Sequence, residues 1–174
     1  YLSIDANAYT DGACLQALRL LGEGLPRVKD DPTDLEARLK CLMGAWMSMT
    51  GVITGSRLGA SHAIGHILGG SAGVPHGHTS CIMLPYVLNW NESVNGERQK
   101  EVAIAMGRPG VAAGQVLDEF ISGLDMPRRI RDAGVKESDL LRLAENCMLD
   151  DWTYSNPREI RSPEQVMEIL RMAY

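Results

Sequence analysis

Apolar residues recur along this chain at the three- and four-residue spacing of helices, rather than in the alternation that marks strands. The clearest stripe forms one helical face near the start of the chain and consists of Cys14, Leu15, Leu18, Leu21 and Leu25. Pro26 follows where such a helix is expected to close. The pattern predicts an all-α protein, a helical bundle with buried central helices.

A capping pattern marks the start of a second, longer helix. Thr33 is expected to cap it, with Glu36 at the third helical position. We expect this helix to run to about Thr54. Residues 41–53 are apolar around most of its circumference, which predicts burial among other helices, with the methionines filling the core.

The rest of the chain predicts shorter helices with recognisable boundary signals. Gly69 and Gly70 are expected to end the first of them, and Pro85 to start or kink the second. Pro127 suits a first helical position and Ser138 a cap. The predicted ranges are 60–68, 81–90, 97–106, 112–124, 127–133, 138–148 and 163–172.

Length, charge and cysteine usage restrict the class of protein. The 174 residues, 45% of them hydrophobic, predict a single all-helical domain, 1–174, with a real core. A net charge of −5 argues against nucleic acid or an anionic membrane as a partner. No run of eighteen apolar residues and no signal-peptide pattern is present. Four scattered cysteines fit reduced thiols, so we expect a cytoplasmic protein.

All four histidines lie within seventeen residues, at His62, His66, His76 and His78. Histidine titrates near neutral pH and is the commonest metal ligand, so this cluster is the candidate site. His62 and His66 are four residues apart, which places them on one helical face where they could share a metal ion. No glutamate lies between them, which argues against a zinc protease of the H-E-x-x-H type.

His76 and His78 flank a glycine after a glycine-rich turn that can bring them back over the first pair. Spacing alone favours His62 and His66 as the metal pair. It leaves open which histidines bind metal and which move protons.

Three motifs in this order resemble the iron-containing alcohol dehydrogenase family. They are G-x-x-H-x-x-x-H-x-x-G within residues 58–70, P-H-G at 75–77, and L-P-x-V-x-x-x-N at 84–91. Leu35-Glu36-Ala37-Arg38 and Asn156-Pro157-Arg158 look like further landmarks of the family. The resemblance covers essentially the whole chain.

The resemblance implies a two-part protein of which this chain is the metal-binding, helical C-terminal part, in the dehydroquinate synthase-like fold. In the family, an upstream α/β domain binds NAD or NADP. A divalent metal, Fe²⁺ or Zn²⁺, is held by an Asp and a His of an upstream D-x-x-x-H motif. Two further histidines, matching His62 and His76, complete that metal site.

The histidine that matches His66 lies near the nicotinamide and the substrate and helps to move a proton. His78 is unusual at its position, where many relatives carry an apolar or acidic residue, and is either a substrate-binding group or simply exposed. Neither the D-x-x-x-H motif nor a glycine-rich phosphate-binding turn is found in the chain, so we expect this chain alone not to turn over. The partners implied are a small-molecule substrate and further copies of the chain in a homo-oligomer, a dimer or larger.

A second branch of the superfamily also fits. Residues 44–46 and 67–70 look like maleylacetate reductases, which reduce a keto-diacid in aromatic degradation and of which several do not depend on metal. The intact P-H-G motif favours the metal-dependent alcohol dehydrogenases. A natural truncation that keeps this domain as a non-catalytic scaffold or oligomerisation module is the third alternative.

Overall fold

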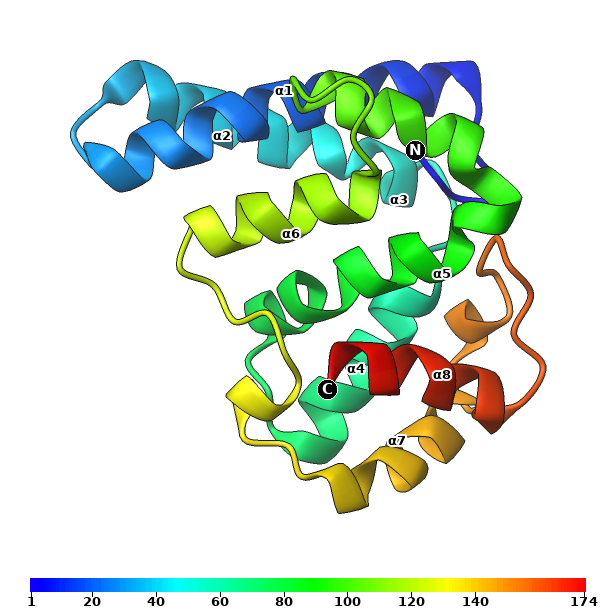
Figure 1. Cartoon of the computed structure of the whole chain (residues 1–174). Helices are drawn as coiled ribbons and strands as arrows, with labels where there is room; N and C mark the ends of the chain where they lie inside the picture. The colour runs from blue at the N-terminus through cyan, green and yellow to red at the C-terminus, as the bar shows by residue number, and fades with distance from the viewer.

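The computed structural model describes all 174 residues and contains only helices (Figure 1). The prediction of an all-α protein is confirmed. In chain order the elements are α1 (Ala8–Asp30), α2 (Leu35–Ser48), α3 (Thr50–Ile53), α4 (Ala60–Ala72), α5 (His76–Ala105), α6 (Ala113–Gly123), the 3-10 helices η1 (Arg131–Ala133) and η2 (Glu137–Asp139), α7 (Leu140–Cys147), the 3-10 helix η3 (Asp151–Thr153) and α8 (Pro163–Ala173).

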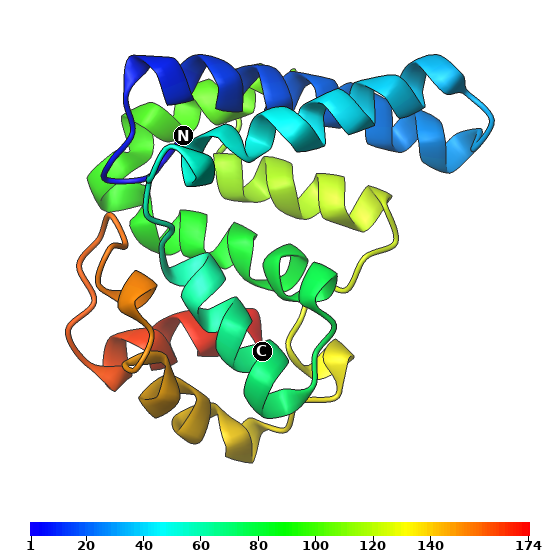
Figure 2. The same ribbon diagram turned by 180° about the vertical axis from the view of Figure 1, so that it is seen from behind.

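The long helix α5 passes through the middle of the molecule. The α1–α2 hairpin lies at one end and α7 and α8 at the other, as both views show (Figures 1 and 2). The larger hydrophobic core joins α4, α5, α7 and α8, and a smaller one joins α5 to α6. None of the helices combines the length and the apolar character that crossing a lipid bilayer requires.

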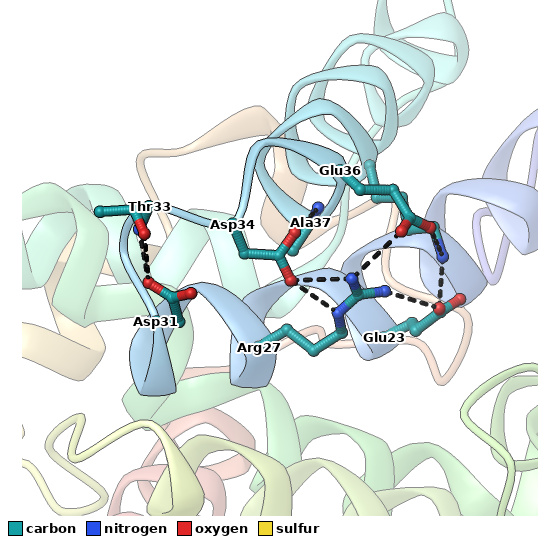
Figure 3. Close-up of polar contacts among 8 residues, drawn as sticks. Glu23, Arg27, Asp31, Thr33, Asp34, Glu36 and Ala37 are labelled. Carbon is teal, nitrogen blue, oxygen red and sulfur yellow. Dashed lines mark hydrogen bonds and ion pairs between the residues drawn. The ribbon is translucent and has the colours of Figure 1, made fainter.

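The predicted end of the first helix at Pro26 is wrong, because α1 continues through this proline to Asp30. The next residue, Arg27, donates to the carboxylate of Asp34 (Nη2 to Oδ2, 2.7 Å) and lies 3.3 Å from that of Glu36 (Figure 3). These ion pairs across the turn stabilise the last helical turn and offset the backbone bond that proline removes.

The N-cap of α2 is Asp34, not the predicted Thr33. Asp34 accepts a hydrogen bond from the backbone N–H of Ala37 (3.0 Å). Thr33 is held instead by Asp31, whose carboxylate accepts from its backbone N–H (2.9 Å) and its hydroxyl (2.7 Å) (Figure 3). Asp31 therefore stabilises the turn while Asp34 caps the helix, which starts one residue later than predicted.

The predicted burial of α2 is also wrong. On one side the helix packs closely on α1, for example where Gly44 meets Leu21: a β-carbon at Gly44 would lie 2.8 Å from the Leu21 Cγ. Its other side is open, so Leu42 is 70% exposed and Trp46 75% exposed. The exposed large apolar side chains of α2, α3 and the single residue between them are Leu35, Leu39, Leu42, Met43, Trp46, Met49, Val52 and Ile53.

The helices predicted over 81–90 and 97–106 form one element, α5, which starts at His76 and contains Pro85. The bend falls at Asn95 (φ −135°, ψ 19°) rather than at the proline. Gln99 spans this bend, because its amide nitrogen donates to the Leu88 carbonyl and to the Asn95 side chain, both at 2.8 Å. The Gln99 side chain therefore links the two halves of α5 across the bend.

The predictions for the last third of the chain are mixed. Those for 112–124 and 163–172 are confirmed as α6 and α8, with Pro163 at the first position of α8. Pro127 starts no helix, because the segment that follows is tied to α8 by the Ile130 N–H, which donates to the carbonyl of Ala173 (2.9 Å). Ser138 lies inside η2 instead of capping a helix.

Candidate functional site

The four histidines lie at the corner where α4 meets α5. His62 and His66 are on α4, as predicted, and His76 and His78 are in the first turn of α5. Gly73 ends α4 in the left-handed conformation (φ 70°) and donates to the Gly69 carbonyl (3.1 Å). Only residues 73–75 separate the two helices, so His76 returns near His62.

Close packing of α4 on α5 fixes this corner. A β-carbon at Gly65 would lie 3.0 Å from the Thr79 hydroxyl oxygen, so only glycine fits there without displacement. The buried Thr79 hydroxyl donates to the carbonyl of His76 (2.8 Å). One side chain thus links the glycine between the first two histidines to the turn that carries the third.

His62 is half-buried, and burial lowers the pKa of its imidazole, with smaller contributions from the neighbouring His66 and His76. His66 and His76 are therefore both near His62. A neutral imidazole is the form that binds a metal ion. Nowhere in the chain do three His, Cys, Asp or Glu side chains gather into a metal-binding group. His62 and His76 can therefore supply only part of a coordination sphere.

His66 has a partner that the sequence did not indicate. Its Nδ1 lies 2.7 Å from Oδ2 of Asp150, in the segment between α7 and η3. The ring also lies against Trp152, with ring centroids 4.9 Å apart, and Trp152 meets His62 edge-on at 6.1 Å. Asp150 follows His66 by 84 residues, so no local spacing could have linked them.

Two of the motifs singled out in the sequence meet at the start of α4. Asn156 and Asn91 bond reciprocally: each side-chain nitrogen donates to the other's oxygen, at 2.7 Å from Asn156 and 3.1 Å from Asn91. The Asn156 oxygen also accepts from the N–H of Ala60 (3.2 Å), and its nitrogen donates to the carbonyl of Arg158 (2.6 Å). These buried amides anchor the first turn of α4, two residues before His62.

Two adjoining hollows border His62. One, of about 350 Å³, is mostly apolar and lies among α1, α5 and α6, with Leu18, Leu84 and Leu117 in its wall. The other, of about 180 Å³, shares Leu84 and Leu88 with the first and also has polar residues in its wall, among them Ser61 and Asn91. A residue that borders mostly apolar hollows with a few polar groups in the wall is well placed to meet a small, partly polar ligand.

The model of the Fe-containing alcohol dehydrogenase family, C-terminal, matches residues 1–174. The chain belongs to the iron-containing alcohol dehydrogenase family. The family and fold predicted from the three motifs are thereby confirmed.

Curated relatives and solved structures agree with this membership. The chain is 31% identical over its whole length to 1,3-propanediol dehydrogenase of Citrobacter freundii. It is 32% identical over 98% of its length to maleylacetate reductase 2 of Cupriavidus pinatubonensis. A solved structure from Ralstonia eutropha JMP134 superposes on 99% of the chain with a TM-score of 0.90 and 34% identity. The chain spans about half the length of these relatives: 47% and 46% of the two enzymes and 48% of the solved chain.

Proposed function

We propose that this chain is the helical, metal-binding half of an NAD(P)-dependent and metal-dependent alcohol dehydrogenase that interconverts an alcohol and an aldehyde or ketone. The observation that carries the proposal is the corner of α4 and α5. There the half-buried His62 lies near His76 and beside two hollows, while His66 faces Asp150. Relatives named 1,3-propanediol dehydrogenase and NAD-dependent methanol dehydrogenase support the reaction class.

His62 and His76 would hold the metal ion, Fe²⁺ or Zn²⁺, together with ligands from outside this chain. The lowered pKa of His62 fits this role, because the unprotonated imidazole presents a lone pair without first losing a proton. When bound, such an ion polarises the substrate oxygen as a Lewis acid, and the nicotinamide accepts or donates hydride. The choice of ligands follows the family resemblance, since spacing alone favoured His62 with His66.

His66 would assist catalysis by moving the hydroxyl proton of the alcohol toward solvent. It is more exposed than His62 and lies one helical turn away on the same face of α4. In the family resemblance His66 also lies near the nicotinamide.

His78 would contribute to substrate binding, because it is half-buried in the same first turn of α5 as His76.

The test is alcohol-dependent reduction of NAD⁺ and NADP⁺ by the full-length protein, before and after removal of metal with a chelator. We expect activity on short primary alcohols that is lost on chelation and restored by Fe²⁺ or Zn²⁺. Activity toward maleylacetate that survives chelation would contradict this proposal and favour a maleylacetate reductase, to which the 32% identical relative also points. A full-length protein that binds neither dinucleotide nor metal would favour the non-catalytic scaffold.

We further propose that the protein is cytoplasmic and assembles into a dimer or larger homo-oligomer. The four cysteines form no disulfide, which suits a reducing compartment. The exposed apolar side chains of α2 and α3 suit burial in an assembly. Light scattering of the full-length protein measures the oligomeric state directly, and a monomer at micromolar concentration would contradict the assembly.

A further inference from the structure

The carboxylate of Asp150 is held in place by backbone and side-chain contacts on both of its oxygens. Oδ1 accepts from the backbone N–H of Trp152 (2.9 Å) and so caps η3. The remaining oxygen, Oδ2, faces Nδ1 of His66 at 2.7 Å. The Asp150 side chain is only 17% exposed, so its orientation is fixed largely by the protein.

This contact determines which ring nitrogen of His66 carries the proton. A carboxylate can only accept a hydrogen bond, so Nδ1 must be the donor. In the neutral ring the proton then sits on Nδ1, and Nε2 presents a free lone pair. Nε2 is at the far side of the ring from Asp150, where it is free to accept a proton.

Trp152 supports the same arrangement. Its ring lies against the His66 imidazole at a 35° tilt and edge-on to that of His62. Since the backbone of Trp152 is itself bonded to Asp150, one short segment fixes both the tautomer and the plane of the His66 ring.

We propose that Asp150 is a positioning residue that holds His66 in the Nδ1–H tautomer, so that Nε2 serves as the proton acceptor in alcohol oxidation. The catalytic part of this inference rests on the proposed dehydrogenase function. The tautomer part does not, because it concerns two side chains of this chain alone.

The test is imidazole ¹⁵N NMR of the protein at mildly alkaline pH, above the ordinary pKa of histidine. His66→Gln identifies the His66 signal among only four histidines. The informative variant is Asp150→Asn, because its oxygen can still cap η3 while its NH₂ group replaces Oδ2. An amide nitrogen only donates, so Nδ1 of His66 must become the acceptor and the proton must move to Nε2.

We expect the Nδ1–H pattern in the unmodified protein and in the control Asp151→Asn, whose exposed carboxylate makes no hydrogen bond to His66. Asp150→Asn should invert the pattern, with the other three histidine signals unchanged. An Nε2–H tautomer in the unmodified protein, or no change in Asp150→Asn, would overturn the assignment.

Kinetics of the full-length enzyme then test the catalytic part. Asp150→Asn should lower kcat by about 10²–10⁴-fold, the usual range for a general acid–base group, with KM and metal content unchanged. Loss of metal, or an unchanged kcat beside an inverted tautomer, would refute the positioning role. If the unmodified protein oxidises no alcohol, the proposed function fails while the NMR result still decides the tautomer.

Discussion

Replacing Asn156 with alanine should destabilise the protein more than any other single amide truncation in the chain. The side chain is 4% exposed and takes part in four hydrogen bonds, two with Asn91 and one each with the backbones of Ala60 and Arg158. A net contribution of about 1 kcal/mol for each bond gives a cost of about 4 kcal/mol. The partners left behind are buried or half-buried, so water cannot fully replace the lost amide.

Urea unfolding followed by circular dichroism measures this cost, provided that the slope of the free energy of unfolding against denaturant stays unchanged. Asn146→Ala is the matched control, because Asn146 is half-buried and makes a single 3.4 Å contact with Ser71. That variant should cost less than about 1 kcal/mol. Equal destabilisation by the two variants would refute the claim that the Asn91–Asn156 pair anchors α4.

Three further predictions concern the site and its surroundings. Gly65→Ala should lower the free energy of unfolding by about 1–3 kcal/mol, because its methyl group would press on Thr79, and an unchanged urea midpoint would contradict the close packing of α4 on α5. Because the pKa of His62 is lowered in the folded protein, the unfolded chain binds a proton on His62 at a higher pH than the folded protein does. The free energy of unfolding therefore has its full value above the ordinary histidine pKa of about 6.5 and falls as the pH drops below it. His62→Gln should reduce this loss of stability when urea unfolding is measured at several pH values. An equal loss in the variant and in the unmodified protein would contradict the role given to His62. Hydrogen bonds from Arg57 lower the pKa of Asp5 to about 2, so this pair should contribute stability above about pH 4 that is lost as the pH falls through about 2. Asp5→Asn should remove this contribution, so that the melting temperature of the variant falls less on acidification than that of the unmodified protein. The same fall in both proteins would contradict a stabilising Asp5–Arg57 pair.

Local patterns in the sequence predicted the helical scaffold of the site well. The four-residue spacing of His62 and His66 placed both on one helix, and a glycine-rich turn was expected to bring His76 back to them, although α4 runs through Gly69 and Gly70 and ends only at Gly73. These features depend on residues within a few turns of one another. Spacing and glycine content are therefore sufficient to indicate them.

The features that the sequence did not predict depend on contacts between distant segments. Nothing near His66 indicates that Asp150 will reach its ring, and the Asn91–Asn156 pair joins residues 65 positions apart. The burial expected for α2 was wrong for a related reason. An apolar helix is buried only where another element covers it, and within this chain only one side of α2 has such a neighbour in α1.

The most direct test of the proposed metal site is the metal content of the full-length protein, measured by plasma mass spectrometry on the unmodified protein and on three alanine variants. His62→Ala and His76→Ala should lose the metal and the activity together, whereas His66→Ala should keep the metal and lose turnover. Full metal content in the first two variants, or metal loss confined to His66→Ala, would contradict the division of roles among the histidines at the corner of α4 and α5.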